Sequence, residues 1–233
     1  MTRLDKFTAE KLNITRSAAK SLIKSGEVFV NSKAVTSPDF KCGDDDEITV
    51  SGRTLSSEKF VYIMMNKPKG VICASDGRGE KTVIDLLPDD MKQKNLFPAG
   101  RLDKDTTGFV LITNDGDFAH SILSPKKHVS KTYLALLDKP VDSGVIMDFE
   151  SGMSLGEETL LPAKLSAENE EKTLVKVVIK QGIYHQIKRM FEKHSLEVLE
   201  LKRIKIGALP LDEKLKEGKC RYITQDELNQ IKQ

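Results

Sequence analysis

Hydrophobic positions in the first fifty residues follow a helical spacing and then a strand-like alternation. In TRLDKFTAEKL, Leu4, Phe7 and Leu12 fall on one stripe of a helix. Thr15 is a good N-cap for a second helix, which ends before a glycine. The segments EVFVNSKAV and EITV then alternate like short strands, the first containing an Asn-Ser turn. This pattern predicts a compact α+β unit over residues 1–52.

The pattern changes after a short polar segment. Residues 53–59 are small and polar, which is typical of a linker. From residue 60 onward, apolar runs typical of strands recur in FVYIMMNKP, FVLIT, TYLALL and LVKVVIK. Three segments have helical patterns: residues 118–123, residues 185–194 and the tail after Thr224, which carries a capping box with Glu227. Because the strands lack regular βαβ spacing, residues 60–233 are predicted to form a mixed, largely antiparallel α+β sheet flanked by helices.

The amino-acid composition says little about binding partners, but it argues against a membrane protein, a disulfide-bonded protein and a metalloprotein. The 233 residues include 37 basic and 35 acidic side chains, a formal net charge of +2. The purest apolar stretch, FVYIMM, is far shorter than the roughly 20 residues of a membrane-spanning helix, and no apolar leader opens the sequence. Three scattered cysteines and four histidines outside metal-binding patterns predict reduced thiols and no bound metal. We therefore expect a cytoplasmic protein that does not contact membranes.

Basic residues gather on one face of the second predicted helix. Arg16, Lys20 and Lys24 recur every four residues, and Arg3 adds to the positive charge of the first 24 residues. Such a face can neutralise phosphates even on a chain of low net charge. An ordinary solvated helix face is the alternative, and the charge pattern alone favours that alternative.

A family resemblance favours RNA binding over a merely solvated helix face. The opening RLDKF, the segment TRSAAKSLIKSGEVFVN and the later GDDDEITV resemble an S4 RNA-binding domain over the whole predicted unit. The resemblance implies that the basic face binds RNA. The residues that it places in this role are Arg3, Arg16, Lys20 and Lys24.

The segment GRLDKDTTG, residues 100–108, concentrates polar groups just before the predicted strand FVLIT. Asp103, Asp105 and Thr107 match a D-x-D-x-T pattern that resembles metal-dependent phosphohydrolases. Those enzymes need an apolar strand before the first aspartate, whereas here the strand follows it. A turn in which polar side chains bond their own backbone is a second alternative. It explains the charged residues on either side of Leu102 poorly, because they suggest partial burial.

A longer resemblance accounts for this segment. The motifs GRLDKDTTGFVLITNDGDFAHSILSPKKHVSKTYLA, QGIYHQIKRMF and VLELKRIKIG are very similar to those of the RsuA-type pseudouridine synthases, in the same order. The resemblance spans residues 60 to about 230. It implies a pseudouridine synthase fold and the isomerisation of uridine in RNA. It implies no metal, nucleotide or organic cofactor.

The resemblance also assigns residues to the reaction. Asp103 occupies the position of the catalytic carboxylate, which acts as nucleophile or as base. Tyr133 matches the tyrosine that stacks on the uracil. Lys188 matches the basic partner of the catalytic aspartate, and the adjacent Arg189 could take that place or bind substrate.

Other positions are implied to contact the substrate around the base. Arg101 matches the arginine that occupies the space vacated by the flipped base or holds a phosphate. Leu201 matches an apolar residue beneath the base, although it could be an ordinary core leucine. Lys126, Lys127 and Lys131 form a basic cluster near Tyr133 that is suited to phosphates or to solvent.

The sequence therefore predicts a two-domain RNA-modifying enzyme. The HQIKRM segment most resembles family members that act on 16S rRNA of the small ribosomal subunit, and we expect free 16S rRNA or a small-subunit assembly particle as partner. We expect a monomer. The alternatives are a 23S rRNA pseudouridine synthase of the same family and a non-catalytic rRNA-binding assembly factor.

Overall fold

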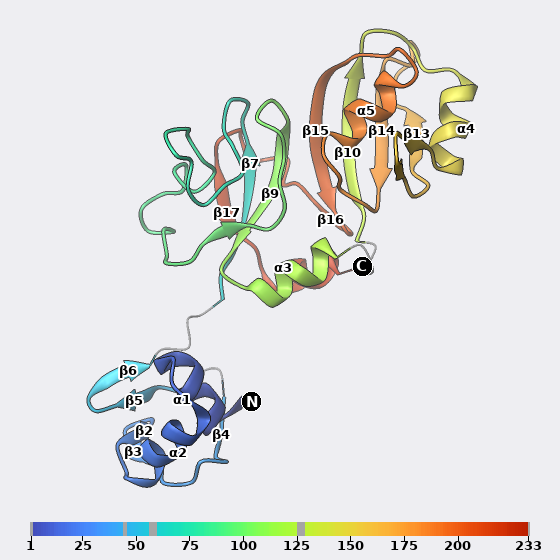
Figure 1. Ribbon diagram of the computed structural model, residues 1–233. Helices are drawn as coiled ribbons and strands as arrows, with labels where there is room; N and C mark the ends of the chain where they lie inside the picture. Colours follow the sequence, from blue (N-terminus) through green and yellow to red (C-terminus); the bar gives the residue numbers. More distant parts are fainter. Residues whose placement is uncertain (1, 44–45, 56–59, 125–128, 233) are drawn as a thin grey trace. The chain divides into compact units, whose positions relative to one another are not determined.

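The computed structural model describes residues 2–43, 46–55, 60–124 and 129–232. These residues form two compact units, Met1–Phe60 and Val61–Gln233, whose elements are labelled in Figure 1. Each unit has its own hydrophobic core.

Two helices pack on a small sheet in the N-terminal unit. The helices are α1 (Leu4–Leu12) and α2 (Arg16–Lys24). The four-stranded sheet has the order β3-β2-β5-β6. Its strands are β2 (Val28–Val30), β3 (Lys33–Ala34), β5 (Ile48–Val50) and β6 (Arg53–Leu55), while β1 (Thr2–Arg3) pairs separately with β4 (Lys41–Cys42).

The sequence pattern accounts for most of this unit. Leu4 is fully buried, and Phe7 and Leu12 pack beside it as expected for one helical stripe. Thr15 caps α2 by accepting a hydrogen bond from the backbone N–H of Ala18. The structure differs at residues 53–55, which were expected to belong to a linker. They form β6 because Leu55 is buried and the segment pairs with β5.

The second unit is built on one nine-stranded mixed sheet. Its main order is β13-β14-β10-β15-β9-β7-β17. The central strands are β7 (Tyr62–Lys67), β9 (Thr107–Thr113), β10 (Lys131–Leu137), β14 (Leu174–Ile179) and β15 (Val198–Ile206). The outer and short strands are β8 (Phe97–Pro98), β13 (Lys164–Ala167), β16 (Leu209–Pro210) and β17 (Cys220–Tyr222). Only β9 and β15 pair in parallel among the described strands of this sheet, which confirms a largely antiparallel architecture.

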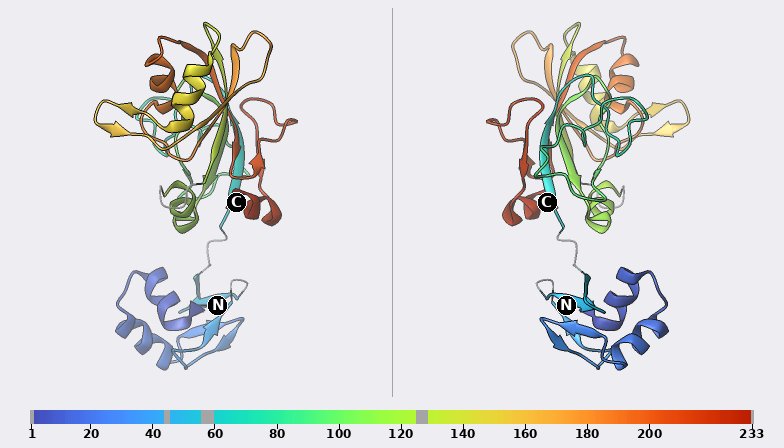
Figure 2. Two further views of the ribbon diagram at one scale, coloured as in Figure 1. Left: turned by 90° about the vertical axis from the view of Figure 1, so that its right-hand side faces the viewer. Right: turned by 90° about the vertical axis from the view of Figure 1, so that its left-hand side faces the viewer.

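Helices cover both faces of this sheet. They are α3 (Gly116–Leu123), α4 (Ser143–Ser151), α5 (Gln186–Glu192) and α6 (Gln225–Ile231). Helices α4 and α5 share one core with β10 and β14, and they lie beside each other in both views of Figure 2. Helices α3 and α6 contribute to the second core. Strand β9 supplies Val110 and Ile112 to the first core and Phe109 and Leu111 to the second, which explains its continuous burial.

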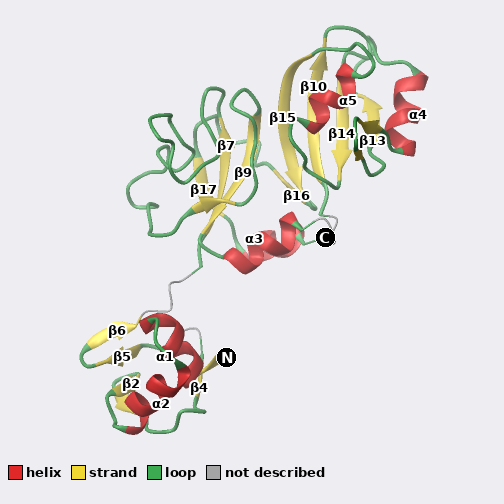
Figure 3. Cartoon of the chain, viewed as in Figure 1, coloured by secondary structure: helices red, strands yellow, loops and turns green. Residues whose placement is uncertain are grey.

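A long connection and a hairpin complete the second unit. Residues 68–96 join β7 to β8 through turns and one isolated bridge, between Ile72 and Thr82, and they appear as loops in Figure 3. The strands β11 (Ser154–Leu155) and β12 (Glu158–Thr159) form a separate hairpin. Both segments contribute contacts near the site described below.

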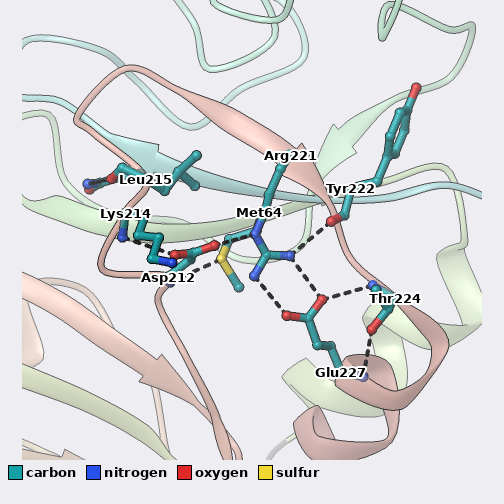
Figure 4. Close-up of polar contacts among 9 residues, drawn as sticks. Met64, Asp212, Lys214, Leu215, Arg221, Tyr222, Thr224 and Glu227 are labelled. Atoms are coloured by element: carbon teal, nitrogen blue, oxygen red, sulfur yellow. Dashed lines mark hydrogen bonds and ion pairs between the residues drawn. The ribbon is translucent and has the colours of Figure 1, made fainter.

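The C-terminal helix is fixed by a polar network drawn in Figure 4. Thr224 and Glu227 form the predicted capping box at the start of α6. Arg221 on β17 donates two hydrogen bonds to the Glu227 carboxylate, at 2.7 and 2.9 Å, and one to Asp212 at 2.7 Å. The tail is therefore joined to the edge of the sheet by paired charges as well as by its apolar face.

Gly108 permits the close parallel contact between β9 and β15. Its φ is +101°, and a Cβ added there would lie 2.2 Å from the backbone oxygen of Arg203. No side chain fits at that distance without moving one of the two strands. The last glycine of GRLDKDTTG is thus required by strand packing.

We predict that Gly108→Ala lowers the free energy of unfolding by more than about 3 kcal/mol, since it combines backbone strain with a clash. Gly70→Ala is the control for strain alone, because Gly70 has φ +83° and open space around it; it should cost about 1–2 kcal/mol. Gly116→Ala has neither problem and should change stability by less than about 0.5 kcal/mol. Hydrogen exchange of β9 and β15 amides measures all three. Equal effects of the first two variants would contradict the packing explanation.

Candidate active site

A buried lysine fixes the turn that carries the conspicuous carboxylates. Lys67, at the end of β7, is fully buried and donates hydrogen bonds to the carbonyl oxygens of Pro68, Lys104 and Thr106, at 3.1, 3.2 and 2.8 Å. Burial lowers the pKa of Lys67, and the nearby acidic side chains of the turn partly oppose this shift. The backbone N–H of Thr106 also donates to the carbonyl of Asp103. The turn between β8 and β9 is therefore held from within the sheet.

This turn forms one wall of a small cavity of about 80 Å³. Asp103 lines the cavity, and Ile179, Ile183 and Ile187 supply apolar walls. The same residues of the turn also line an adjoining cleft of about 800 Å³, which extends toward β10 and β15. A cleft of this size accommodates a nucleotide-sized group.

Two nitrogen-bearing side chains face the Asp103 carboxylate. His185 Nε2 lies 3.5 Å from Oδ1, and Lys188 Nζ lies 3.8 Å from Oδ2. His185 precedes α5 in a left-handed conformation, with φ +49°, and its ring stacks on that of Tyr184 at a centroid distance of 3.9 Å. The start of α5 thus brings both groups to the half-buried aspartate.

Lys188 binds the second carboxylate of the turn more closely. Its Nζ lies 2.7 and 2.6 Å from the two oxygens of Asp105. This hydrogen-bonded ammonium lowers the pKa of the Asp105 carboxyl, against the effect of its partial burial. The structure therefore places Lys188 between two carboxylates, whereas the sequence predicted a pair with Asp103 alone.

Arg189 lies elsewhere. One helical position rotates it by about 100° from Lys188, and its guanidinium pairs with Glu158 on the β11–β12 hairpin at 2.7 Å. It also donates to the carbonyl of Tyr184. Arg189 lines neither the small cavity nor the cleft, so the structure ties it to a hairpin instead of placing it at the predicted substrate contact.

Tyr133 and Leu201 line the cavity from adjacent strands. Tyr133 lies on β10 and Leu201 on β15, and both are largely buried. They belong to the hydrophobic core as well as to the cavity wall, so the core and pocket interpretations of these two residues are compatible. Arg101 is exposed and lines both the cavity and the cleft, which places it at the mouth of the site.

The predicted basic cluster after α3 is only partly described. Lys126 and Lys127 lie outside the described residues. Lys131 is buried and not solvated, and its Nζ donates to the carbonyl of Ile122 at 3.3 Å. Burial and the nearby Arg203 lower the pKa of Lys131 to about 8.

The four basic residues predicted for RNA binding in the N-terminal unit fall into two pairs. Arg3 and Arg16 both bind the fully buried Asp5, at 3.1 and 3.0 Å. These bonds hold the pKa of the Asp5 carboxyl well below its usual range. Lys20 and Lys24 are exposed on α2. Two of the four residues therefore also hold the unit together.

Sequence reasoning gave no chemical role to three groups at the site: Lys67, His185 and Asp105. A lysine inside the apolar run FVYIMMNKP is an available signal for Lys67, because a charged residue in a buried strand needs specific partners. The contacts of His185 and Asp105 depend on how α5 meets the turn, which no local pattern encodes.

Within the described ranges, no cluster of three or more His, Cys, Asp or Glu side chains could hold a metal ion. No described helix is long and apolar enough to cross a membrane.

Replacing Lys188 should release the Asp105 carboxyl. We predict that Lys188→Met raises the pKa of Asp105 toward the value of about 3.9 for an unperturbed aspartate. The ¹³C chemical shift of the Asp105 side-chain carboxyl carbon, followed in an NMR titration, measures this pKa. Arg189→Met is the matched control, since it removes a neighbouring charge without touching Asp105. A shifted pKa in the control, or an unshifted one in Lys188→Met, would contradict the assigned contact.

Comparison with family models identifies both units. The model described as RNA pseudouridylate synthase matches residues 61–193, and the S4 domain model matches residues 2–48. A solved structure described as "Crystal structure of pseudouridylate synthase" aligns with a TM-score of 0.70 at 39% identity, covering 99% of this chain and all of that one. The phosphohydrolase alternative is therefore wrong.

Curated relatives match over nearly the full length. An uncharacterized RNA pseudouridine synthase of Bacillus subtilis is 40% identical, with 97% of each chain covered. The ribosomal small subunit pseudouridine synthases A of Vibrio vulnificus and Escherichia coli are 40% and 37% identical, with 98% of this chain and 99% of theirs covered. The chain belongs to the RNA pseudouridylate synthase family, and it is a pseudouridine synthase with an N-terminal S4 domain that acts on RNA.

Proposed function

We propose that this enzyme converts a uridine of 16S rRNA to pseudouridine, with Asp103 as the catalytic carboxylate. The observation that supports this role most strongly is the position of Asp103. It lines a small cavity that has both apolar and polar walls, on a fixed turn, with the nitrogens of His185 and Lys188 within 4 Å of its oxygens. Asp105 does not line that cavity, so the two carboxylates of the turn have different tasks.

The reaction requires a carboxylate that stays ionised. Pseudouridine formation breaks the N1–C1′ bond of the nucleoside, rotates the uracil and joins C5 to C1′; the proton of C5 is lost and N1 gains one. No electron or group leaves the nucleoside, so the isomerisation balances without a cofactor. Asp103 acts as nucleophile or as base, and both roles need the charged form. His185 Nε2 lies 3.5 Å from one Asp103 oxygen and Lys188 Nζ lies 3.8 Å from the other, so both side chains lie within ion-pairing distance of the carboxylate.

The walls of the cavity suit a flipped uracil. Tyr133 offers an aromatic face for stacking, and Leu201 on the neighbouring strand supplies an apolar contact beneath the base. Arg101 at the mouth is placed to fill the space that the base leaves, or to hold the displaced backbone, which offsets the few kcal/mol that base flipping costs. These groups orient the base while Asp103 acts on it.

The S4 domain supplies affinity for the RNA. Lys20 and Lys24 are exposed cations one helical turn apart on α2, a spacing that suits successive phosphate contacts. Arg3 and Arg16 contribute positive charge at the same surface while neutralising the buried Asp5. This domain binds phosphates and the second unit selects the base.

The choice of 16S rRNA rests on the relatives named ribosomal small subunit pseudouridine synthase A. We include in the proposal that the enzyme acts as a monomer in the cytoplasm on free 16S rRNA or on a small-subunit assembly particle. A 23S rRNA target is the second candidate, because the sequence resembles other branches of the same family that act on large-subunit rRNA. Assays with separate 16S and 23S rRNA distinguish the two targets.

Asp103→Asn should reduce turnover by about 10⁴-fold or more, as removal of an essential catalytic group does. Release of tritium from [5-³H]uridine-labelled 16S rRNA, with no metal added, measures turnover. RNA affinity of the variant should stay near that of the wild type. Asp105→Asn is the matched comparison and should cost far less, because the Asp105 carboxylate pairs with Lys188 and does not line the cavity. Equal losses in the two variants would remove the distinction between the carboxylates, and undiminished turnover in Asp103→Asn would overturn the proposal.

Replacing Lys20 and Lys24 together by Gln should weaken RNA binding and reduce its salt dependence. Each lost phosphate contact removes about 0.7–0.9 from the slope of log K against log salt, so the slope should fall by about 1.4–1.8. Fluorescence anisotropy with labelled 16S rRNA fragments measures it. The control replaces Lys33 and Lys41, two exposed lysines of the same domain outside α2. An unchanged slope in the α2 variant would show that this face does not contact RNA.

A further inference from the structure

Two buried cations beside the catalytic cavity have no acidic partner in the part of the chain that the structure describes. Lys131 on β10 is 9% exposed, and Arg203 on β15 is 4% exposed. No carboxylate of the described residues pairs with either of them. Lys131 donates to the carbonyl of Ile122 at 3.3 Å, and Arg203 Nε donates to that of Phe109 at 2.7 Å. Buried Nη2 of Arg203 has no hydrogen-bond partner.

This arrangement is costly for the protein by itself. A buried charge normally requires a paired counter-charge, and a buried donor without a partner loses the full free energy of its hydration. The two cations also repel each other, and this repulsion adds to burial in lowering the pKa of Lys131 to about 8. At neutral pH most of the Lys131 side chains still carry the proton. The hydrogen bond from Arg203 Nε to the carbonyl of Phe109 satisfies one guanidinium nitrogen, but a neutral carbonyl does not balance the positive charge.

Both cations line the cleft that continues from the catalytic cavity. Arg101, Asp103 and Tyr133 line the same cleft. Arg203 is the cross-strand partner of Tyr133, and Lys131 lies two residues before Tyr133 on the same strand. A register shift between Thr132 and Tyr133 interrupts the regular alternation of side chains, and the lining of one cleft brings Lys131, Tyr133 and Arg203 together. The unpaired positive charge therefore lies directly beside the tyrosine proposed to stack on the uracil.

We propose that Lys131 and Arg203 bind a backbone phosphate of the RNA immediately next to the target uridine. This inference rests on the proposed function, because it assumes that the uracil occupies the cavity at Tyr133. A phosphodiester supplies the missing negative charge: its oxygens accept from the Lys131 ammonium group, and it is attracted by the positive charge of the buried Arg203 guanidinium. The phosphate fixes the ribose relative to Asp103, so that the site orients the sugar as well as the base.

Interference by phosphate ethylation tests the subsite and locates the phosphate within the RNA. Fragments of 16S rRNA are ethylated at random phosphates and mixed with the full-length wild-type protein. Bound and unbound RNA are then separated, and the ethylated positions in each fraction are mapped. Ethylation at one phosphate within two nucleotides of the converted uridine should block binding. In Lys131→Met, affinity for unmodified RNA should fall about 10-fold, as expected for a lost charged hydrogen bond, and ethylation at that phosphate should no longer interfere.

Two further variants make the result specific. Lys139→Met removes an exposed lysine that does not line the cleft, and it should keep the wild-type interference pattern. Lys131→Arg retains the charge and should restore both the affinity and the interfering phosphate. If Lys131→Met proves unfolded by hydrogen exchange, Lys131→Gln, which keeps a polar end group, takes its place in the same comparison.

The outcomes separate this inference from the proposed function. A Lys131→Met protein with wild-type affinity and an unchanged interference map overturns the phosphate subsite, whatever the turnover. Loss of affinity without loss of any single interfering phosphate also overturns it. If the wild type converts no uridine in rRNA, the proposed function fails, while the interference maps of bound RNA still report whether Lys131 contacts one phosphate.

Discussion

The hydrogen bonds from the buried Lys67 ammonium to the backbone of the GRLDKDTTG turn are the interaction on which the site depends. They connect β7 to the turn at Lys104 and Thr106. The turn in turn leads into β9, which approaches β15 so closely that only glycine fits at position 108. A carboxylate aimed into an apolar cavity must be held rigidly, because small displacements reduce catalysis strongly. In this unit a buried cation and a close strand contact provide that rigidity.

The same sheet assembles the site from distant parts of the sequence. Asp103 comes from the turn before β9, Tyr133 from β10, Lys188 from α5 and Leu201 from β15. The ammonium of Lys188 is shared between Asp103 and Asp105, so the free enzyme already places positive charge beside the proposed catalyst. The cations Lys131 and Arg203 extend this positive region along the cleft. The site thus combines a fixed carboxylate with positive charge that continues along the cleft and suits an RNA backbone.

Periodic patterns and caps predicted much of the fold, and long motifs predicted the family. The Thr15 cap, the hairpin around the Asn-Ser turn, the central strands and the Thr224–Glu227 box are local features, and the structure confirms them. Helix α4 was not predicted, although Asp142 caps it and Val145 and Phe149 lie one turn apart on its buried face. Side-chain partners across elements were not predictable. Lys188 bonds Asp105 more closely than Asp103, Arg189 binds Glu158, and Lys131 is buried, all through tertiary geometry that spacing does not encode.

The central claim is that Asp103 of this chain makes pseudouridine in small-subunit rRNA. Chemical mapping of pseudouridine in the 16S rRNA of cells that lack the chain tests it most directly. Those cells then receive either the wild-type chain or Asp103→Asn at equal levels. One pseudouridine should disappear without the chain and return only with the wild type. A pseudouridine that persists without the chain, or that returns with Asp103→Asn, would rule out this role for Asp103.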